Sequence, residues 1–143
     1  MRQWQAVTLL VTASPLVALA GVKSGLLLRS PAVPLWYLLL VAPFWEEAFF
    51  RGGLQSFLLE RSVGNYSFLR ISSANAATAV CFAAAHLPFQ GLAATAVLLP
   101  SLLLGWLFER TRRVFPCVLL HCWFNLSWLL AGYCERFVLL EKL

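Results

Sequence analysis

Long, uninterrupted apolar runs dominate this chain. Each run comes near the roughly 20 residues that a helix needs to cross the hydrocarbon core of a bilayer. Five such runs cover Trp4–Ala20, Leu35–Leu59, Ile71–Phe89, Leu92–Phe108 and Phe115–Tyr133. Because backbone groups in lipid must pair within the segment, continuous runs of this length predict helices. The pattern therefore predicts an all-α, polytopic integral membrane bundle with about five transmembrane helices.

Proline and glycine residues separate these runs. The breaks fall at Pro31 and Pro34, at Gly64-Asn65, at Pro88 with Gly91, and at Pro116. We detect no internal repeat and no low-complexity tract. We therefore treat residues 1–143 as a single membrane-embedded domain, with its most informative motifs in residues 35–130.

The first run has two interpretations. Arg2, followed by apolar residues up to Ala18-Leu19-Ala20-Gly21, resembles a signal peptide with a small-residue cleavage site. The same run is also about as long as a spanning helix. We favour a retained first helix, because the remainder of the chain is itself membrane-embedded.

Composition agrees with a membrane protein. The hydrophobic content of 61%, the charged content of 12% and the mean hydropathy of +0.79 leave too little polar surface for a soluble domain. The net charge of +5 would suit nucleic acid, but Arg110, Arg112 and Arg113 lie between two apolar runs, where they fit cytoplasmic anchoring better. We expect no nucleic-acid partner.

The distribution of Lys and Arg between the runs predicts an orientation in the membrane. Six basic residues fall on one side of the membrane and four on the other, which places the amino terminus in the cytoplasm. We expect the protein to lie in the cell membrane, which in a bacterium is the inner membrane. The larger group is Arg2, Arg61, Arg70, Arg110, Arg112 and Arg113, and the smaller is Lys23, Arg29, Arg136 and Lys142.

The second run carries three charged residues near its centre, Glu46, Glu47 and Arg51. A charge at mid-bilayer costs about 2.5–3.5 kcal/mol on insertion scales, so function is its default explanation. On a helix, Glu47 and Arg51 are four residues apart and can pair, whereas Glu46 is turned about 100° away and is free to meet another helix. This run is either one long helix or a helix that bends at Gly52-Gly53.

Two histidines and an asparagine add to this inventory. His86 lies on the third run, and His121 and Asn125, four residues apart, project from one face of the last run. Glu46 can act as a general base on a water that His86 shares, while His121 and Asn125 donate to a developing oxyanion. These are the groups that hydrolysis of an amide within the membrane requires.

Each group also has a structural interpretation. Glu47 and Arg51 can form a buried ion pair, and His86, His121 and Asn125 can serve as helix-end or interhelical hydrogen-bonding residues. Six polar groups on three helices are expensive to maintain in lipid without a shared wet cavity, which favours a site.

Four cysteines, Cys81, Cys117, Cys122 and Cys134, lie within or beside the apolar runs with no CxxC pair, as packing residues do. Cys117 precedes His121 by four residues, so a Cys–His nucleophile or a mixed metal site stays open. The chain has no Asp, no HExxH and no GxSxG, which removes the two-aspartate, usual zinc and serine protease classes. The remaining groups can bind zinc or act without metal.

Three short motifs carry a family resemblance. Residues 46–52 read EEAFFRG, residues 82–86 read FAAAH and residues 121–125 read HCWFN, in the order EExxxR, FxxxH and HxxxN. They resemble the CPBP (CAAX protease and bacteriocin-processing, also called ABI) family of intramembrane proteases. Residues 105–111, GWLFERT, resemble the family's connector, and the resemblance covers roughly Leu35 to Leu130.

The resemblance implies an all-helical membrane endopeptidase of the glutamic type. Its substrate would be a membrane-anchored protein or peptide, of the CAAX, bacteriocin or carboxy-terminal sorting-signal kind. It implies Glu46 as the base, His86 as its partner on the water, and His121 and Asn125 as the oxyanion hole. The supporting residues that it implies are Glu47, Arg51 and Phe82.

We expect no required cofactor, with zinc on Glu46, His86 and His121 as the alternative. The expected partners are the lipid bilayer and the substrate, and a homo-oligomer would replace helices that longer relatives have. The main alternative function is a non-catalytic partner-binding or immunity subunit. A transporter or channel subunit is less favoured, because its polar residues would line a pathway rather than gather in three motifs.

One difficulty concerns depth. In an up-and-down bundle the third and fifth runs point the same way, yet His86 lies late in the third and His121 early in the fifth. At about 1.5 Å per residue, the two imidazoles would then lie at different depths in the membrane.

Overall fold

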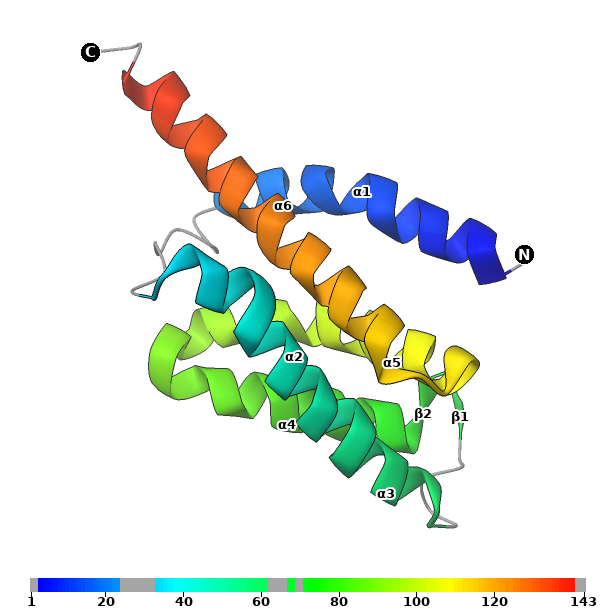
Figure 1. The fold of residues 1–143 in the computed structure, drawn as a ribbon. Helices are drawn as coiled ribbons and strands as arrows, with labels where there is room; N and C mark the ends of the chain where they lie inside the picture. The colour runs from blue at the N-terminus through cyan, green and yellow to red at the C-terminus, as the bar shows by residue number, and fades with distance from the viewer. Residues whose placement is uncertain (1–2, 24–32, 62–66, 69–70, 141–143) are drawn as a thin grey trace.

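The computed structural model describes residues 3–23, 33–61, 67–68 and 71–140 (Figure 1). These residues are helical apart from short connections and one antiparallel pair of two-residue strands, β1 (Ser67–Phe68) and β2 (Ile71–Ser72). The predicted all-α class is confirmed. Several predicted breaks and charges lie outside the described residues, namely Arg2, Arg29, Pro31, Gly64-Asn65, Arg70 and Lys142.

The helices follow the predicted apolar runs closely. In chain order they are α1 (Gln3–Lys23), η1 (Tyr37–Val41), α2 (Ala42–Glu47), η2 (Ala48–Gln55), α3 (Ser56–Leu59), α4 (Ser73–Gln90), η4 (Gly91–Val97), α5 (Leu98–Thr111) and α6 (Val114–Leu140). The segments η1 and η2 are π-helical, and η4 is a 3₁₀-helix. Helical structure therefore continues from Tyr37 to Leu59, and we call this stretch the rod.

The rod decides between two sequence-based alternatives. Its helical backbone runs through Gly52 and Gly53 without a break, because both residues lie inside η2. The long helix is therefore the observed form, and it carries wide π-helical turns on both sides of α2. Single π-helical segments within α-helices occur often at functional sites.

A hairpin of helices packs against the rod. In Figure 1, α4 and α5 lie side by side and are joined by η4. The turn begins at Gly91, whose φ of 59° suits a residue without a Cβ. At the other end of α4, the Ser72 side chain accepts a 2.9 Å hydrogen bond from the Asn75 backbone N–H and caps the helix.

Two prolines that we expected to end helices lie inside them. Pro88 is within α4, which continues to Gln90, so the break comes at Gly91 alone. Pro116 is in the first turn of α6. A proline there removes an N–H that would have no helical partner in any case, so the helix tolerates it.

Three stretches of the described helices are long and apolar enough to cross a membrane: Gln5–Val22, Ser73–Thr111 and Val114–Glu135. The prediction of about five spans is therefore wrong. The third and fourth runs form one helical stretch that folds back as the hairpin of α4 and α5.

The second predicted run, Leu35–Leu59, is not among these three stretches, and the reason is its charge content. Every 18-residue window within Leu35–Leu59 contains Glu46, Glu47 and Arg51, and this charge content sets it apart from the apolar stretches. The residues that make the rod chemically informative are thus also those that lower its apolar character.

Burial in this protein is inverted relative to a soluble domain. The largest fully buried side chains include Arg51, Gln55 and Glu47, while Leu92 and Phe89 are 84% and 77% exposed. Exposed apolar surface on this scale marks contact with lipid or with another apolar partner. A polar interior inside an apolar exterior is the arrangement expected for a bundle in lipid.

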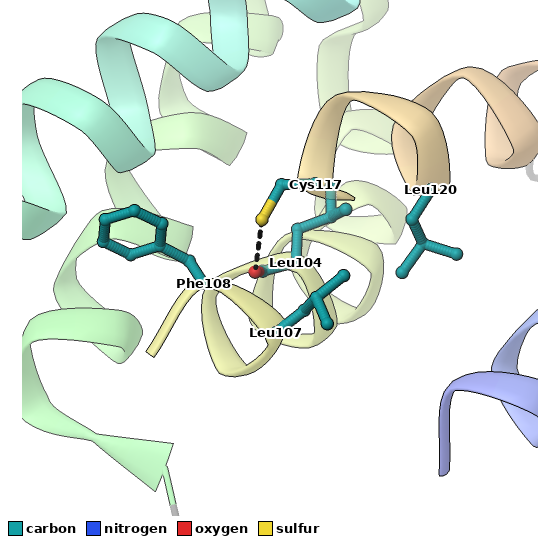
Figure 2. Packing of buried hydrophobic residues seen from close by; sticks show 5 residues of the cluster. All are labelled: Leu104, Leu107, Phe108, Cys117 and Leu120. Carbon is teal, nitrogen blue, oxygen red and sulfur yellow. Dashed lines mark hydrogen bonds between the residues drawn. The ribbon is translucent and has the colours of Figure 1, made fainter. Parts of the chain in front are cut away.

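The long helix α6 joins the parts together. It crosses the bundle diagonally in Figure 1 and contacts α1, α5 and the rod. Figure 2 shows its apolar contact with α5, which consists of Leu104, Leu107, Phe108, Cys117 and Leu120. This packing fixes the amino-terminal half of α6, from which two of the predicted site residues project.

Candidate active site

The site is built around a fully buried carboxylate. Glu47 Oε2 lies 3.1 Å from Arg51 Nε, and both side chains have no exposed surface. The predicted ion pair four residues apart on the rod is therefore present. The other oxygen, Glu47 Oε1, accepts a 2.8 Å hydrogen bond from His121 Nδ1 on α6. Glu47 thus connects its own helix to α6.

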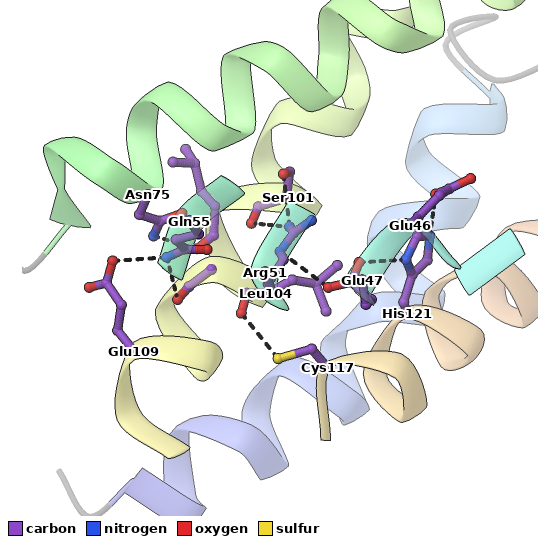
Figure 3. Close-up of polar contacts among 12 residues, drawn as sticks. Glu46, Glu47, Arg51, Gln55, Asn75, Ser101, Leu104, Glu109, Cys117 and His121 are labelled. Atoms are coloured by element: carbon purple, nitrogen blue, oxygen red, sulfur yellow. Dashed lines mark hydrogen bonds and ion pairs between the residues drawn. The ribbon is translucent and has the colours of Figure 1, made fainter. Parts of the chain in front are cut away.

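Arg51 extends the same chain of contacts to α5 (Figure 3). Its Nη2 donates to the Ser101 carbonyl oxygen at 2.8 Å and to Ser101 Oγ at 2.9 Å. Its guanidinium carbon also lies 5.2 Å from the centroid of the Phe82 ring on α4. A buried charge is tolerated when it is paired and hydrogen-bonded, and Arg51 meets both conditions.

His121 stands between two carboxylates of unequal burial. Its Nδ1 contacts the fully buried Glu47, while its Nε2 lies 3.7 Å from Oε2 of Glu46, whose side chain is 30% exposed. Donation from Nδ1 to Glu47 fixes the orientation of the ring and turns Nε2 toward Glu46. The prediction that Glu46 meets another helix is confirmed.

His86 and Phe82 approach this cluster from α4. The His86 Nδ1–H donates to the Phe82 carbonyl oxygen at 2.8 Å, which leaves Nε2 as the nitrogen available for other contacts. The Phe82 ring centroid lies 4.6 Å from that of His86 and 5.9 Å from that of His121. The two histidines therefore flank one aromatic ring and belong to one cluster, which answers the difficulty over depth.

Asn125 lies one turn beyond His121 on α6 and also faces the rod. Its Nδ2 donates a 2.9 Å hydrogen bond to the carbonyl oxygen of Leu38 in η1. The shared face that the spacing of four residues predicts is present. The direct contact of Asn125 is thus with the backbone of the rod, one segment before α2.

A second polar cluster, which the sequence analysis missed, continues along the buried side of the rod. Gln55 Nε2 donates to Glu109 Oε1 at 2.9 Å and to the Gly105 carbonyl oxygen at 3.1 Å. Ser72 Oγ also donates to Glu109 Oε1, and Asn75 Nδ2 donates to the Leu102 carbonyl oxygen at 3.0 Å. Gln55 follows Arg51 by four residues, so helical spacing could have identified it.

The alternative of a Cys–His nucleophile has no support in the geometry. Cys117 is completely buried, and its thiol donates to the backbone carbonyl oxygens of Leu104 at 3.5 Å and of Arg113 at 3.6 Å. Both ring nitrogens of His121 face carboxylates instead. Cys117 is a core residue with a satisfied thiol, as its place in the apolar contact of Figure 2 shows.

The structure also bears on the zinc alternative. In the part of the chain that it describes, no three His, Cys, Asp or Glu side chains are arranged to hold a metal ion. Glu46, His86 and His121 are thus not drawn together as a preformed set of ligands. Zinc at these residues stays a prediction.

Fold and site together define a helical membrane protein with a carboxylate–imidazole cluster enclosed among its helices. The model of the type II CAAX prenyl endopeptidase Rce1-like family matches residues 28–127, which is more than half of the chain. The chain therefore belongs to this family, as the three motifs indicated, and it is a CAAX-type intramembrane protease. Searches of curated proteins and of solved structures gave no match.

Proposed function

We propose that this protein is a glutamic-type endopeptidase that hydrolyses a peptide bond of a membrane-anchored protein through a water activated by Glu46. One observation carries the proposal. Glu46 is partly exposed beside His121, whose other ring nitrogen is held by the fully buried Glu47. An accessible carboxylate next to an oriented imidazole is suited to general acid–base chemistry.

The reaction begins with the water. Glu46 removes a proton from it as the oxygen attacks the scissile carbonyl carbon, and His86 Nε2 accepts the second O–H of the same water. The carbonyl π electrons move to the oxygen and form a tetrahedral oxyanion. Glu46 then gives its proton to the departing amine as the C–N bond breaks, which leaves two products and restores the carboxylate.

The oxyanion receives two donors from α6. His121, protonated on both nitrogens, donates from Nε2, and Asn125 donates from its amide. The buried Glu47 stabilises the imidazolium through the 2.8 Å contact to Nδ1, and Arg51 in turn holds Glu47. Donors fixed in this way need no reorganisation when charge develops, which is the basis of oxyanion stabilisation.

The family name supplies the substrate class. A CAAX prenyl endopeptidase acts on a protein anchored by a prenyl group near its carboxyl terminus. The apolar exterior of this bundle can receive such a chain laterally from the lipid. A bacteriocin-type or sorting-signal substrate stays the alternative. We assign the protein to the cell membrane, which in a bacterium is the inner membrane.

The decisive test is Glu46→Gln, which keeps the shape and removes the base. Glu60→Gln is a matched control, because Glu60 is exposed at the end of the same rod. Purified proteins in liposomes are incubated with a farnesylated CAAX peptide, with and without a chelator, and products are identified by mass spectrometry. E46Q should lose at least about 100-fold in kcat, the usual contribution of a general base, while E60Q cleaves normally.

Cleavage by E46Q at the E60Q rate would overturn the proposal and favour a non-catalytic binding subunit. The chelator arm tests the expectation that no cofactor is required. Cleavage that persists under chelation supports this expectation, and loss that zinc restores would contradict it.

A further inference from the structure

The hydrogen bond between Asn125 and the rod depends on a backbone irregularity. In η1 the Ala42 backbone N–H bonds to the Tyr37 carbonyl oxygen, five residues back, rather than to Leu38, four residues back. The Leu38 carbonyl oxygen is thereby passed over, and Asn125 Nδ2 bonds to it at 2.9 Å. A widened turn therefore exposes the acceptor that α6 uses.

Pro43 explains why the turn widens here. It is fully buried in the first turn of α2 and has no backbone N–H. In the π-helical register, residue 43 would be the donor to Leu38, so that carbonyl oxygen loses both of its helical donors. The proline ring also clashes with the carbonyl of residue 39 in an ordinary α-turn, which favours the wider one.

The same device occurs independently on α1. Pro15 lies inside that helix, so the carbonyl oxygen four residues earlier, that of Val11, lacks its α-helical donor. Trp123 Nε1 on α6 donates to it at 2.9 Å, and the Ser14 hydroxyl of the same helix as Val11 donates to it at 3.1 Å. Two side chains two residues apart on α6 thus both donate to carbonyl oxygens that lie four or five residues before a proline.

We infer that Pro43 is a positioning residue for Asn125. By withholding an N–H it keeps the Leu38 carbonyl oxygen available, and this acceptor takes one of the two N–H groups of the Asn125 amide. The amide plane is then fixed, and its second N–H is directed at the substrate oxyanion. The last step rests on the proposed function, whereas the hydrogen bond and its cause do not.

The first test is independent of activity. The chain has Asn at positions 65, 75 and 125, so labelling with ¹⁵N-asparagine in micelles gives few side-chain amide signals, and Asn125→Ala assigns one pair. Pro43→Ala supplies an N–H that competes for Leu38, so the bonded proton of Asn125 should move upfield. The Asn75 pair, bonded to Leu102 between α4 and α5, should stay in place and shows that the fold is intact.

Two further variants sharpen this test. Pro43→Ser restores the same N–H with a different side chain and should produce the same shift, while Pro15→Ala, the matched change on α1, should leave Asn125 unmoved. Since alanine is a far better helix former than proline, P43A is expected to fold. An Asn125 signal that is unchanged in both P43A and P43S would overturn the inference, whatever the activity.

The second test is a kinetic cycle on the farnesylated peptide. P43A should lower kcat, with KM unchanged, toward the about 100-fold loss that a misplaced catalytic group brings. In the N125A background, P43A should have no further effect, because both changes remove one interaction. Additive losses would overturn a role through Asn125. Failure of the proposed function is recognised separately, by cleavage that persists in E46Q.

Discussion

Replacing Gly105 with alanine should destabilise the protein strongly, although alanine favours helices. A Cβ at position 105 would lie 2.0 Å from Asn75 Oδ1, 2.6 Å from Asn75 Cγ and 3.0 Å from Gln55 Oε1. Real Cβ atoms do not approach other atoms to 2.0 Å, so Asn75 must move. Because Asn75 is 1% exposed, its amide has no water with which to replace the contacts that it loses.

The magnitude follows from these contacts. Moving Asn75 breaks its 3.0 Å hydrogen bond to the Leu102 carbonyl oxygen, and an unpaired buried polar group costs about 1–3 kcal/mol. Overpacking adds about 1–3 kcal/mol, and the better helix propensity of alanine returns about 0.5–1 kcal/mol. We therefore expect G105A to lower the free energy of unfolding by about 3 kcal/mol, measured by denaturant or thermal unfolding in micelles followed by circular dichroism.

Gly132→Ala on α6 is the matched control, because no atom lies within 4 Å of a Cβ built there. It should be neutral or stabilise the protein by up to about 1 kcal/mol. The double variant N75A/G105A should recover much of the loss relative to N75A alone, since the clash is then absent. Equal stability of G105A and G132A would contradict the close approach of α4 and α5 at Gly105.

Two further predictions concern contacts between helices. Arg51→Lys should lower the free energy of unfolding by about 1.5–3 kcal/mol, because one ammonium cannot replace both the ion pair with Glu47 and the hydrogen bonds to Ser101. The control is Arg61→Lys at an exposed position, and equal melting temperatures of R51K and R61K would contradict the prediction. Trp123→Phe should lower the free energy of unfolding by about 1 kcal/mol, because it removes the donor to the Val11 carbonyl oxygen. Hydrogen exchange of the α1 backbone should become faster, and unchanged exchange would contradict the prediction.

Local patterns in the sequence could predict part of the structure. Apolar runs gave the helices because their length and composition act over neighbouring residues. The Glu47–Arg51 pair and the shared face of His121 and Asn125 followed from helical spacing alone. The contact of Glu46 with another helix followed from its turn away from that pair. Each of these depends on positions within a few residues of one another.

Contacts between helices could not be predicted in this way, because they join residues that are far apart in the sequence. Gln55 and Glu109 are 54 residues apart, and nothing in the spacing of either indicates the other. The fold-back of α4 and α5 within one apolar stretch depends on how the hairpin packs, so the number of spans was overestimated. The Asn125–Leu38 contact needed both the wide turn at Pro43 and the diagonal course of α6.

The inverted burial explains why these polar contacts form a connected chain. Lipid supplies no hydrogen bonds, so a polar group between the helices is stabilised by partners inside the protein. Ser101 accepts from Arg51, Arg51 pairs with Glu47, and Glu47 accepts from His121, so these four groups are linked to one another by contacts within the protein. Glu46, at 30% exposed, is the carboxylate at the open end of this chain. The series of contacts therefore orients the His121 ring and ends at a carboxylate that water can reach, which is the arrangement that a general base in a membrane requires.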